Sequence, residues 1–218
     1  MNKKLLLATL LLTLPALLRA DAPSAVTSDA ALKTLLAGNE RFVHGHLTSV
    51  TARELTQRRA ELVHGQKPFA IVLCCSDSRV GPEIVFDQEL GNIFVVRTAG
   101  EVLDTAGVGS IEYAVAHLGA PLLVVLGHEH CGAVAAAVAD AKEPGNIADI
   151  IKAIQPAVAE THGQPGDPLE NAIRANAQAI ATRLRSTSPV LAEKVKAGQL
   201  TVIAAVLSLK TGQIEMQK

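Results

Sequence analysis

Cysteine and histidine residues that could bind a metal occur in two short clusters of the sequence. Cys74 and Cys75 end the apolar run of residues 71–75, and His128 and Cys131 lie three residues apart in GHEHCGAV. A disulfide between neighbouring cysteines would strain the backbone, and a bond from either one to Cys131 would leave one thiol unpaired. Two thiolates and one imidazole are ligands that zinc takes in a tetrahedral site. A metal site therefore explains these residues better than a disulfide does.

Three protein ligands would leave one position of a zinc ion for water. Structural zinc sites are closed by four protein ligands, whereas catalytic sites keep one position open. Zinc lowers the pKa of a bound water from about 15.7 to about 7, so an open site makes hydroxide at neutral pH. We therefore expect Cys75, His128 and Cys131 to bind one Zn²⁺ ion per subunit at a catalytic site.

An acid and an arginine follow the first cluster closely. Asp77 and Arg79 lie two and four residues after Cys75. A carboxylate near zinc could itself occupy the open position, but an arginine can hold it through two hydrogen bonds and aim a lone pair at the bound hydroxide. We therefore predict that Asp77 and Arg79 form a catalytic pair.

Both clusters are expected to follow strands of a parallel sheet. Continuous apolar runs, which indicate strands covered on both faces, occupy residues 69–74, 92–97 and 121–127. A helical pattern over residues 105–119 lies between the second and third runs, so these elements make a crossover unit. Because the carboxyl ends of parallel strands open onto one crevice, the two clusters should face the same site.

Further helices and a C-terminal hairpin complete the predicted fold. Ser28 is expected to cap the first helix, and Asp167 a later helix that has Pro168 at its first position. Together with the crossover helix, helices are predicted over residues 29–45, 51–64, 133–140, 146–160, 167–186 and 191–199. Two strand-like pieces flank a turn at residues 210–212. The expected fold class is α/β, with a central, mainly parallel sheet flanked by helices, a C-terminal antiparallel hairpin and an N-terminal helical arm.

The first twenty residues differ in composition from the rest of the chain. Two lysines precede an apolar run over residues 5–18, which is shorter than the roughly 20 residues of a membrane-spanning helix. The pattern predicts a cleaved secretory signal peptide at residues 1–20, with an uncleaved anchor as the alternative. The mature chain, residues 21–218, would then be a single domain in a periplasm or outside the cell, with no membrane span.

The overall composition excludes several classes of function. A length of 218 residues suits one domain with a full hydrophobic core. Hydrophobic residues make up 49% of the chain and the formal net charge is -1. Neither a polycation that binds nucleic acid nor a disordered acidic tail fits these values. We therefore expect a small-molecule substrate and no nucleic-acid partner.

Two blocks of the sequence resemble the motifs of the beta-class carbonic anhydrases. They are CSDSR at residues 75–79 and GHEHCG at residues 127–132, and the likeness extends from about residue 39 to the C-terminal hairpin. The resemblance implies that the three expected ligands bind zinc, that the acid and the arginine form the catalytic dyad, and that the enzyme reversibly hydrates carbon dioxide to bicarbonate. It also implies a homodimer or homotetramer, with the N-terminal helices embracing the partner and the sites near the interface.

The resemblance further implies an open, plant-like site with a substrate pocket. Gln66, Phe94 and Tyr113 fall at the family's pocket positions, and Gly132, which follows a ligand directly, is also assigned to substrate binding. Carbon dioxide is apolar and needs only a hydrophobic slot, whereas bicarbonate needs a donor such as the Gln66 amide. Phe94 and Tyr113 could instead be core aromatics.

The chain departs from the family pattern at two segments and at Cys74. Residues 90–92 are Leu-Gly-Asn and residues 97–99 are Arg-Thr-Ala, which leaves subunit contacts and pocket hydrogen bonds open but affects no ligand. Cys74 stands where the family usually has a small residue, and we expect it to be a buried, inert thiol. The histidines other than His128 are not evident ligands.

Three alternative functions remain at this point. A member of the same fold family could hydrolyse carbon disulfide or carbonyl sulfide. A zinc-binding protein without turnover could use Asp77 as its fourth ligand, although a structural site has no use for an arginine that holds the carboxylate back. A thiol nucleophile built from Cys131 and His128 would leave Cys75 unexplained.

Overall fold

The computed structural model describes residues 26–49 and 52–217, so the predicted signal peptide lies outside the described residues. The strands are β1 (Ala70–Cys74), β2 (Ile93–Arg97), β3 (Leu122–His128), β4 (Thr201–Leu207) and β5 (Ile214–Met216). The helices are α1 (Ser28–Val43), α2 (Ala52–Glu61), α3 (Pro82–Val85), α4 (Thr105–Ala116), α5 (Gly132–Val138), α6 (Ile147–Thr161), α7 (Pro168–Leu184) and α8 (Pro189–Lys196), with a short 3-10 helix, η1 (Ala99–Glu101).

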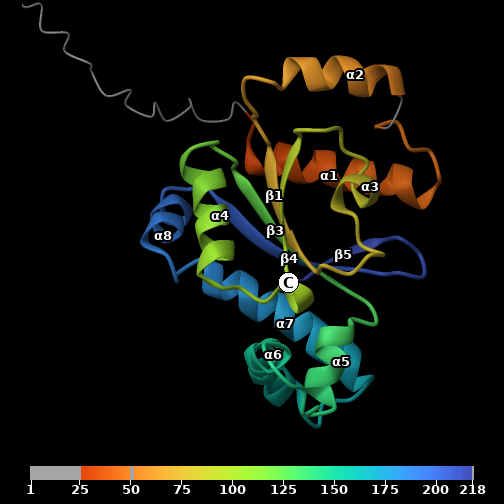
Figure 1. Cartoon of the computed structure of the whole chain (residues 1–218), viewed down its shortest axis with the longest axis vertical. Helices are drawn as coiled ribbons and strands as arrows, with labels where there is room; N and C mark the ends of the chain where they lie inside the picture. The colour runs from red at the N-terminus through yellow and green to blue at the C-terminus, as the bar shows by residue number, and fades with distance from the viewer. Residues whose placement is uncertain (1–25, 50–51, 218) are drawn as a thin grey trace, which may run out of the picture.

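The strands form one mixed sheet between two layers of helices (Figure 1). Within the described residues its order is β2-β1-β3-β4-β5, and only β5 runs antiparallel to its neighbour. Helices α4, α7 and α8 cover one face of the sheet, and α1 and α3 cover the other. The predicted α/β class, the parallel centre and the C-terminal hairpin are confirmed.

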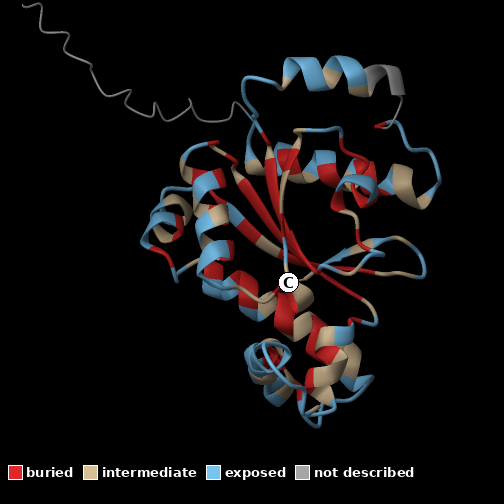
Figure 2. Cartoon of the chain, viewed as in Figure 1, coloured by how far each residue is buried: buried red, intermediate tan, exposed pale blue. Residues whose placement is uncertain are grey.

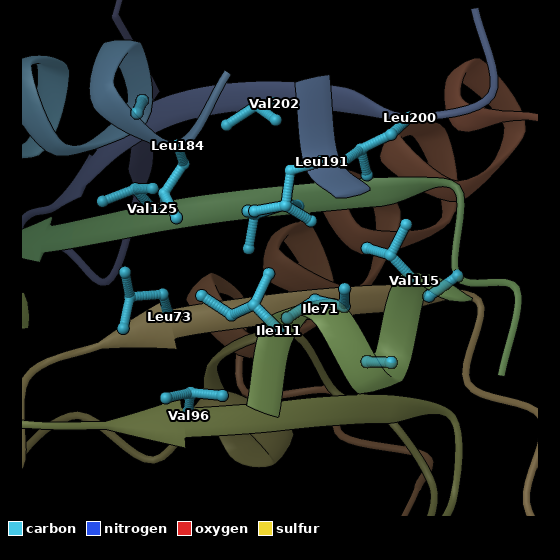
Figure 3. Close-up of a cluster of buried hydrophobic side chains, with 14 of the residues drawn as sticks. Ile71, Leu73, Val96, Ile111, Val115, Val125, Leu184, Leu191, Leu200 and Val202 are labelled. Atoms are coloured by element: carbon cyan, nitrogen blue, oxygen red, sulfur yellow. The ribbon is translucent and has the colours of Figure 1, made fainter. Parts of the chain in front are cut away.

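Side chains of the central strands alternate between the two hydrophobic layers. Ile71 and Leu73 of β1 point toward Ile111 of α4 and Leu191 of α8 (Figure 3). Their neighbours Ala70, Val72 and Cys74 belong to the cluster on the opposite face, beneath α1. Because successive strand residues face opposite sides, Cys74 enters the α1 layer while the next residue turns toward the other side. This alternation explains how two adjacent cysteines have different surroundings.

A third hydrophobic cluster lies beyond the carboxyl ends of the strands. It joins α5, α6 and the first half of α7, which lie together at one end of the molecule (Figure 1). Cys75 and Cys131 belong to this cluster, next to Val134 and Ile154. The ends of β1 and β3 are therefore enclosed by the helices that follow the second sequence motif.

The N-terminal helices differ strongly in burial. Helix α1 packs Ala31 and Leu35 into the core. Helix α2 is largely exposed and lies outside the two layers (Figures 1 and 2), as a helical arm would. Among the described residues, no helix combines the length and the apolarity that crossing a bilayer requires.

The first helix cap differs from the prediction. Thr27, not Ser28, is the N-cap of α1, and its hydroxyl accepts a hydrogen bond from the Ala30 amide at 3.2 Å. Both residue types can cap a helix, so composition does not decide between neighbours. Asp167 caps α7 with Pro168 at the first helical position, as predicted. Two short elements, α3 and η1, were not predicted, because they are too short to show a hydrophobic period.

Candidate metal centre

The three expected ligands converge at the carboxyl ends of two neighbouring strands. Cys75 follows β1, His128 is the last residue of β3, and Cys131 is the N-cap of α5. The two sulfur atoms are 4.0 Å apart, and the three possible ligand atoms lie within 4.8 Å of one another. All three residues are buried. The parallel pairing of β1 with β3 thus brings together residues that are more than fifty positions apart in the sequence.

The ring of His128 is held in an orientation that suits a metal ligand. Its Nδ1 atom is 2.8 Å from the Glu129 carbonyl oxygen, so an Nδ1–H group can donate there. Its Nε2 atom is buried and, among the described residues, has no hydrogen-bond partner. A buried nitrogen without a partner is costly, but an Nε2 lone pair that faces a metal ion is satisfied. Metal-binding histidines usually donate their other ring N–H to a carbonyl or carboxylate oxygen in this way.

The two thiols are electrostatically prepared to bind a cation. A hydrogen bond between the sulfurs lowers the pKa of Cys75 to about 4, against the effect of burial, and the same bond raises the pKa of Cys131. The Gly100 amide donates to the Cys75 sulfur at 3.3 Å and stabilises the thiolate. Without a metal the pair would therefore keep one proton, which a divalent cation displaces when both sulfurs become ligands. Two sulfurs and one imidazole fit zinc.

Asp77 and Arg79 form a bidentate ion pair at the edge of this cluster. Arg79 donates from Nε to Oδ1 at 2.8 Å and from Nη2 to Oδ2 at 2.7 Å, and its amide also donates to Oδ1. These bonds hold the pKa of Asp77 well below its usual range, so the carboxylate stays ionised. Asp77 Oδ2 is 3.9 Å from His128 Nε2. The predicted pair is therefore formed, and it lies next to the ligands.

Arg97 holds the loop between the first ligand and the acid. Its guanidinium donates to the Cys75 carbonyl oxygen at 3.1 Å and to the Asp77 carbonyl oxygen at 2.8 Å. Sequence analysis noted Arg97 but gave it no role. The available signal was its position at the end of β2, directly opposite Cys74 in the strand register.

Gly100 is a second supporting residue that sequence analysis missed. Its φ of +64° is one that side chains rarely adopt, and a Cβ here would lie 2.7 Å from Ile154 Cδ1 and 3.1 Å from Ala133 Cβ. Asn176 on α7 donates to the Gly100 carbonyl oxygen at 2.9 Å. The backbone is thereby fixed with its amide directed at the Cys75 sulfur. Only the glycine itself could have indicated this conformation.

The predicted pocket residues do not all lie near the ligands within one chain. Gly132 follows Cys131 and borders a cavity of about 390 Å³ whose walls are mainly apolar; its other lining residues are Ala99, Ala133, Ala136, Glu143, Ile147, Ile150 and Ile151. Gln66 precedes the amino end of β1, whereas Cys75 follows its carboxyl end. Five strand residues span about 16 Å at about 3.3 Å each. Within a single protomer, Gln66 therefore lies at the opposite end of β1 from the ligand cluster.

Phe94 and Tyr113 lie together but also away from the ligands. Their ring centroids are 6.5 Å apart, and Phe94 is opposite Ile71 in the register of β1 and β2, four residues before Cys75. Phe94 is half-buried against the α4 layer, and Tyr113 is 45% exposed. The alternative that both are core aromatics thus fits Phe94 better than Tyr113.

Comparison with known proteins agrees with this geometry. A family model described as carbonic anhydrase matches residues 70–214. Carbonic anhydrase 2 of Mycobacterium tuberculosis is 40% identical over 188 residues, which cover 84% of this chain and 90% of the relative. A solved beta-carbonic anhydrase of Coccomyxa, in complex with acetazolamide, matches with a TM-score of 0.68 at 25% identity and covers 85% of both chains. The chain belongs to the beta-class carbonic anhydrases.

Other relatives agree with this assignment. The carbonic anhydrase of Mycolicibacterium smegmatis is 38% identical over 192 residues, covering 86% of this chain and 92% of the relative. A chain from the crystal structures of two tetrameric beta-carbonic anhydrases of Sordaria macrospora shares the fold, with a TM-score of 0.70 at 22% identity; the match covers 85% of this chain and 95% of that chain. Members of this family are zinc-dependent carbonate dehydratases, and Cys75, His128 and Cys131 are positioned to bind the zinc ion of such an enzyme.

The remaining cysteine and the other histidines are not part of this cluster. Cys74 is fully buried, and burial raises its pKa to about 12, as expected of an inert thiol. His130 is exposed and adopts a φ of 52° in the ligand loop. In the described part of the chain, Cys75, His128 and Cys131 are the only group of three or more acidic, cysteine and histidine residues close enough to share a metal ion.

Glu101 is a buried acid near the site, and it makes stability depend on pH. Its side chain is 1% exposed, and its Oε2 atom has no hydrogen-bond partner among the described residues. Burial, with a smaller effect of the Cys75 charge, raises its pKa well above the ordinary value of 4.5. The folded state therefore keeps a proton that the unfolded chain loses above about pH 4.5. This group's contribution to stability is fully present below that pH and falls as the pH rises toward the folded pKa.

Replacing Glu101 by Met should make the protein relatively more stable at higher pH. Methionine fills a similar volume without a titrating group, so the gain in melting temperature over the parent should grow between pH 5 and pH 8. Differential scanning calorimetry with saturating zinc in both proteins measures this difference. A gain that stays constant over the pH range would show that the carboxyl does not titrate on unfolding.

Proposed function

We propose that this chain hydrates carbon dioxide reversibly to bicarbonate, with Cys75, His128 and Cys131 as zinc ligands and Asp77 and Arg79 as the catalytic pair. The observation that carries the proposal is the convergence of the three ligand atoms beside a carboxylate that Arg79 holds at both oxygens. Zinc, when bound, lowers the pKa of a coordinated water to about 7 and so supplies hydroxide at neutral pH.

The carboxylate of Asp77 accepts a hydrogen bond from the O–H group of the attacking oxygen and so orients a lone pair of that oxygen toward the substrate carbon. Because it is ionised, Asp77 can only accept. Arg79 restrains both carboxylate oxygens and also donates to the His130 carbonyl oxygen at 3.3 Å, which ties the pair to the ligand loop. This restraint keeps Asp77 from acting as a fourth ligand, and it argues against a purely structural zinc site.

The cavity beside Gly132 is suited to an apolar substrate. Alanine and isoleucine side chains form most of its wall, and it begins next to a zinc ligand. Ala99, at its rim, precedes Gly100, whose amide contacts the Cys75 sulfur. We therefore propose that carbon dioxide, which has no net dipole, enters along these residues, while charged solutes gain nothing from such a surface.

The alternative substrates can be separated by one assay. Carbon dioxide hydration, carbonyl sulfide hydrolysis and carbon disulfide hydrolysis should be measured in parallel on one zinc-loaded preparation, the first by stopped flow with a pH indicator and the other two by release of hydrogen sulfide. We expect rapid hydration and little sulfide. Sulfide release that is faster than hydration would assign the chain to the sulfur substrates.

We also propose that the substrate pocket is completed by a second copy of the chain. In the described part of the chain, β2 has a hydrogen-bonded neighbour on one side only, and an apolar edge strand favours pairing. A two-fold axis beside β2 would run the two β2 strands in opposite directions. The amino-end residues Gln66, Phe94 and Tyr113 of the second copy would then approach the carboxyl-end site of the first. The tetrameric Sordaria relatives are compatible with such a dimer as a building block.

Mixed dimers can test this arrangement. Gln66→Ala should lower hydration by about 10²-fold through loss of a donor, and His128→Ala should remove zinc. If Gln66 serves the partner's site, co-expression of both variants should restore about a quarter of the parent rate, because half of the dimers are mixed and each has one intact site. If Gln66 acts within its own chain, every site keeps one defect and no activity returns.

We further propose that the chain is exported. The positive charge before the apolar run of residues 5–18 supports a signal peptide that is cleaved after Ala20. Intact mass measurement of the protein from a periplasmic extract should give a chain that begins at Asp21. A cytosolic protein that still starts at residue 1 would contradict export.

A further inference from the structure

Glu129 connects the zinc-ligand loop to the turn that follows β4. Its carboxylate accepts hydrogen bonds from the Ser208 hydroxyl at 3.0 Å and from the Lys210 amide at 3.3 Å. Its own amide donates to the Leu207 carbonyl oxygen at 3.0 Å, which continues the pairing of β3 with β4 by one residue. The residue after the ligand His128 is thus bound through both its main chain and its side chain.

The same residue also holds the imidazole ring. The Glu129 carbonyl oxygen lies 2.8 Å from His128 Nδ1, so it fixes the tautomer that carries its proton there. The other nitrogen, Nε2, then keeps a lone pair for a metal ion, and it lies within 4.8 Å of the sulfur atoms of Cys75 and Cys131. Any movement of the Glu129 peptide group would rotate this ring away from the ligand position.

The turn that receives the Glu129 carboxylate is itself fixed to the first helix. Asn39, which is 3% exposed, donates to the Gly212 carbonyl oxygen at 2.8 Å and accepts from the Ile214 amide at 3.0 Å. Gly212 has a φ of +77°, and a Cβ on it would lie 2.9 Å from Phe42 Cε1. The turn therefore has little freedom to move, and it is a firm anchor for the ligand loop.

We propose that Glu129 is a positioning residue for the zinc ligand His128. Its side-chain carboxylate is bound to the Ser208–Lys210 turn, and this anchor keeps the main-chain carbonyl oxygen of Glu129 against His128 Nδ1. The inference rests on the zinc site of the proposed function. Partners of metal-bound histidines typically affect metal affinity by 10- to 100-fold. Glu129 acts here through its main chain, and its side chain supplies the rigidity.

The test compares zinc release from the loaded parent and three variants. Glu129→Ala should release zinc to a chelator at least about tenfold faster than the parent. Glu129→Gln keeps an acceptor oxygen for Ser208 and should release zinc more slowly than Glu129→Ala. Lys210→Ala keeps the main-chain N–H group that donates to the Glu129 carboxylate and should match the parent, so it is the control for changes in the same turn.

A second measurement separates positioning from a general loss of stability. In nitrogen-15 NMR spectra of the zinc-loaded proteins, exchange of the His128 Nδ1 proton with solvent should be at least about tenfold faster in Glu129→Ala than in the parent. Exchange of core amides in β1 should be unchanged. Zinc release and Nδ1 exchange both within twofold of the parent would overturn the inference. Failure of the parent itself to bind zinc would instead overturn the proposed function.

Discussion

Cys75→Ser and His128→Ala should each remove bound zinc and carbon dioxide hydration together. Each variant leaves two protein ligands, which hold zinc far more weakly than three, and the unpaired partner sulfur or imidazole stays buried. Hydroxide at neutral pH depends on the metal. We therefore expect the hydration rate to fall by more than about 10³-fold, which is less than the full acceleration of about 10⁶-fold or more that enzymes usually provide. Zinc content by mass spectrometry and stopped-flow hydration measure both effects.

The neighbouring cysteine offers a matched control for this prediction. Cys74→Ala removes the thiol next to Cys75 in the sequence, which lies in the hydrophobic layer beneath α1. This variant should keep one zinc per chain and nearly the parent rate. A Cys75→Ser or His128→Ala protein with a full complement of zinc would refute the ligand assignment. The same would follow if Cys74→Ala lost its zinc while remaining folded.

Asp77→Ala should keep zinc but lose most of the turnover. Arg79 donates hydrogen bonds to both oxygens of the carboxylate, and the three expected ligand atoms belong to other residues, so the loss of Asp77 leaves them in place. Without it, the attacking oxygen has no acceptor that directs its lone pair, and such positioned acid–base groups typically contribute 10²- to 10⁴-fold. We expect kcat to fall within about that range.

Two further variants define what the pair does. Arg79→Lys keeps a positive charge but cannot form the two parallel hydrogen bonds, so it should retain zinc and lose part of the rate. Asp140→Ala removes an exposed carboxylate that pairs with Lys142 and should leave the rate unchanged. If Asp77→Ala hydrates carbon dioxide as fast as the parent, the catalytic pair has been assigned to the wrong residues.

The convergence of the three expected zinc ligands could be predicted from the sequence, because these residues lie at or just after the ends of two strands. Apolar runs located β1 and β3, and parallel pairing requires that Cys75, His128 and Cys131 meet at one end of the sheet. Asp77 and Arg79 followed from their short distance along the chain. Hydrophobic periodicity and residue type were sufficient to place these residues together, because the carboxyl ends of neighbouring parallel strands lie at the same edge of a sheet.

Supporting residues could not be predicted in this way. Arg97, Gly100 and Asn176 act through hydrogen bonds to residues that are distant in the sequence, and such contacts leave no periodic pattern. The link from Glu129 to Ser208 joins residues 79 positions apart. Gln66 and Tyr113 were assigned to the pocket from the family resemblance alone, and because one chain places Gln66 at the amino end of β1, that assignment stays a prediction.

The most direct measurement is a zinc titration of the zinc-depleted chain, followed by carbon dioxide hydration at each step. We expect no measurable hydration before zinc is added, then a linear rise to a plateau at one zinc per chain, and we expect Cys131→Ser not to reach this plateau. Full activity without zinc, or a plateau that Cys131→Ser shares with the parent, would contradict it.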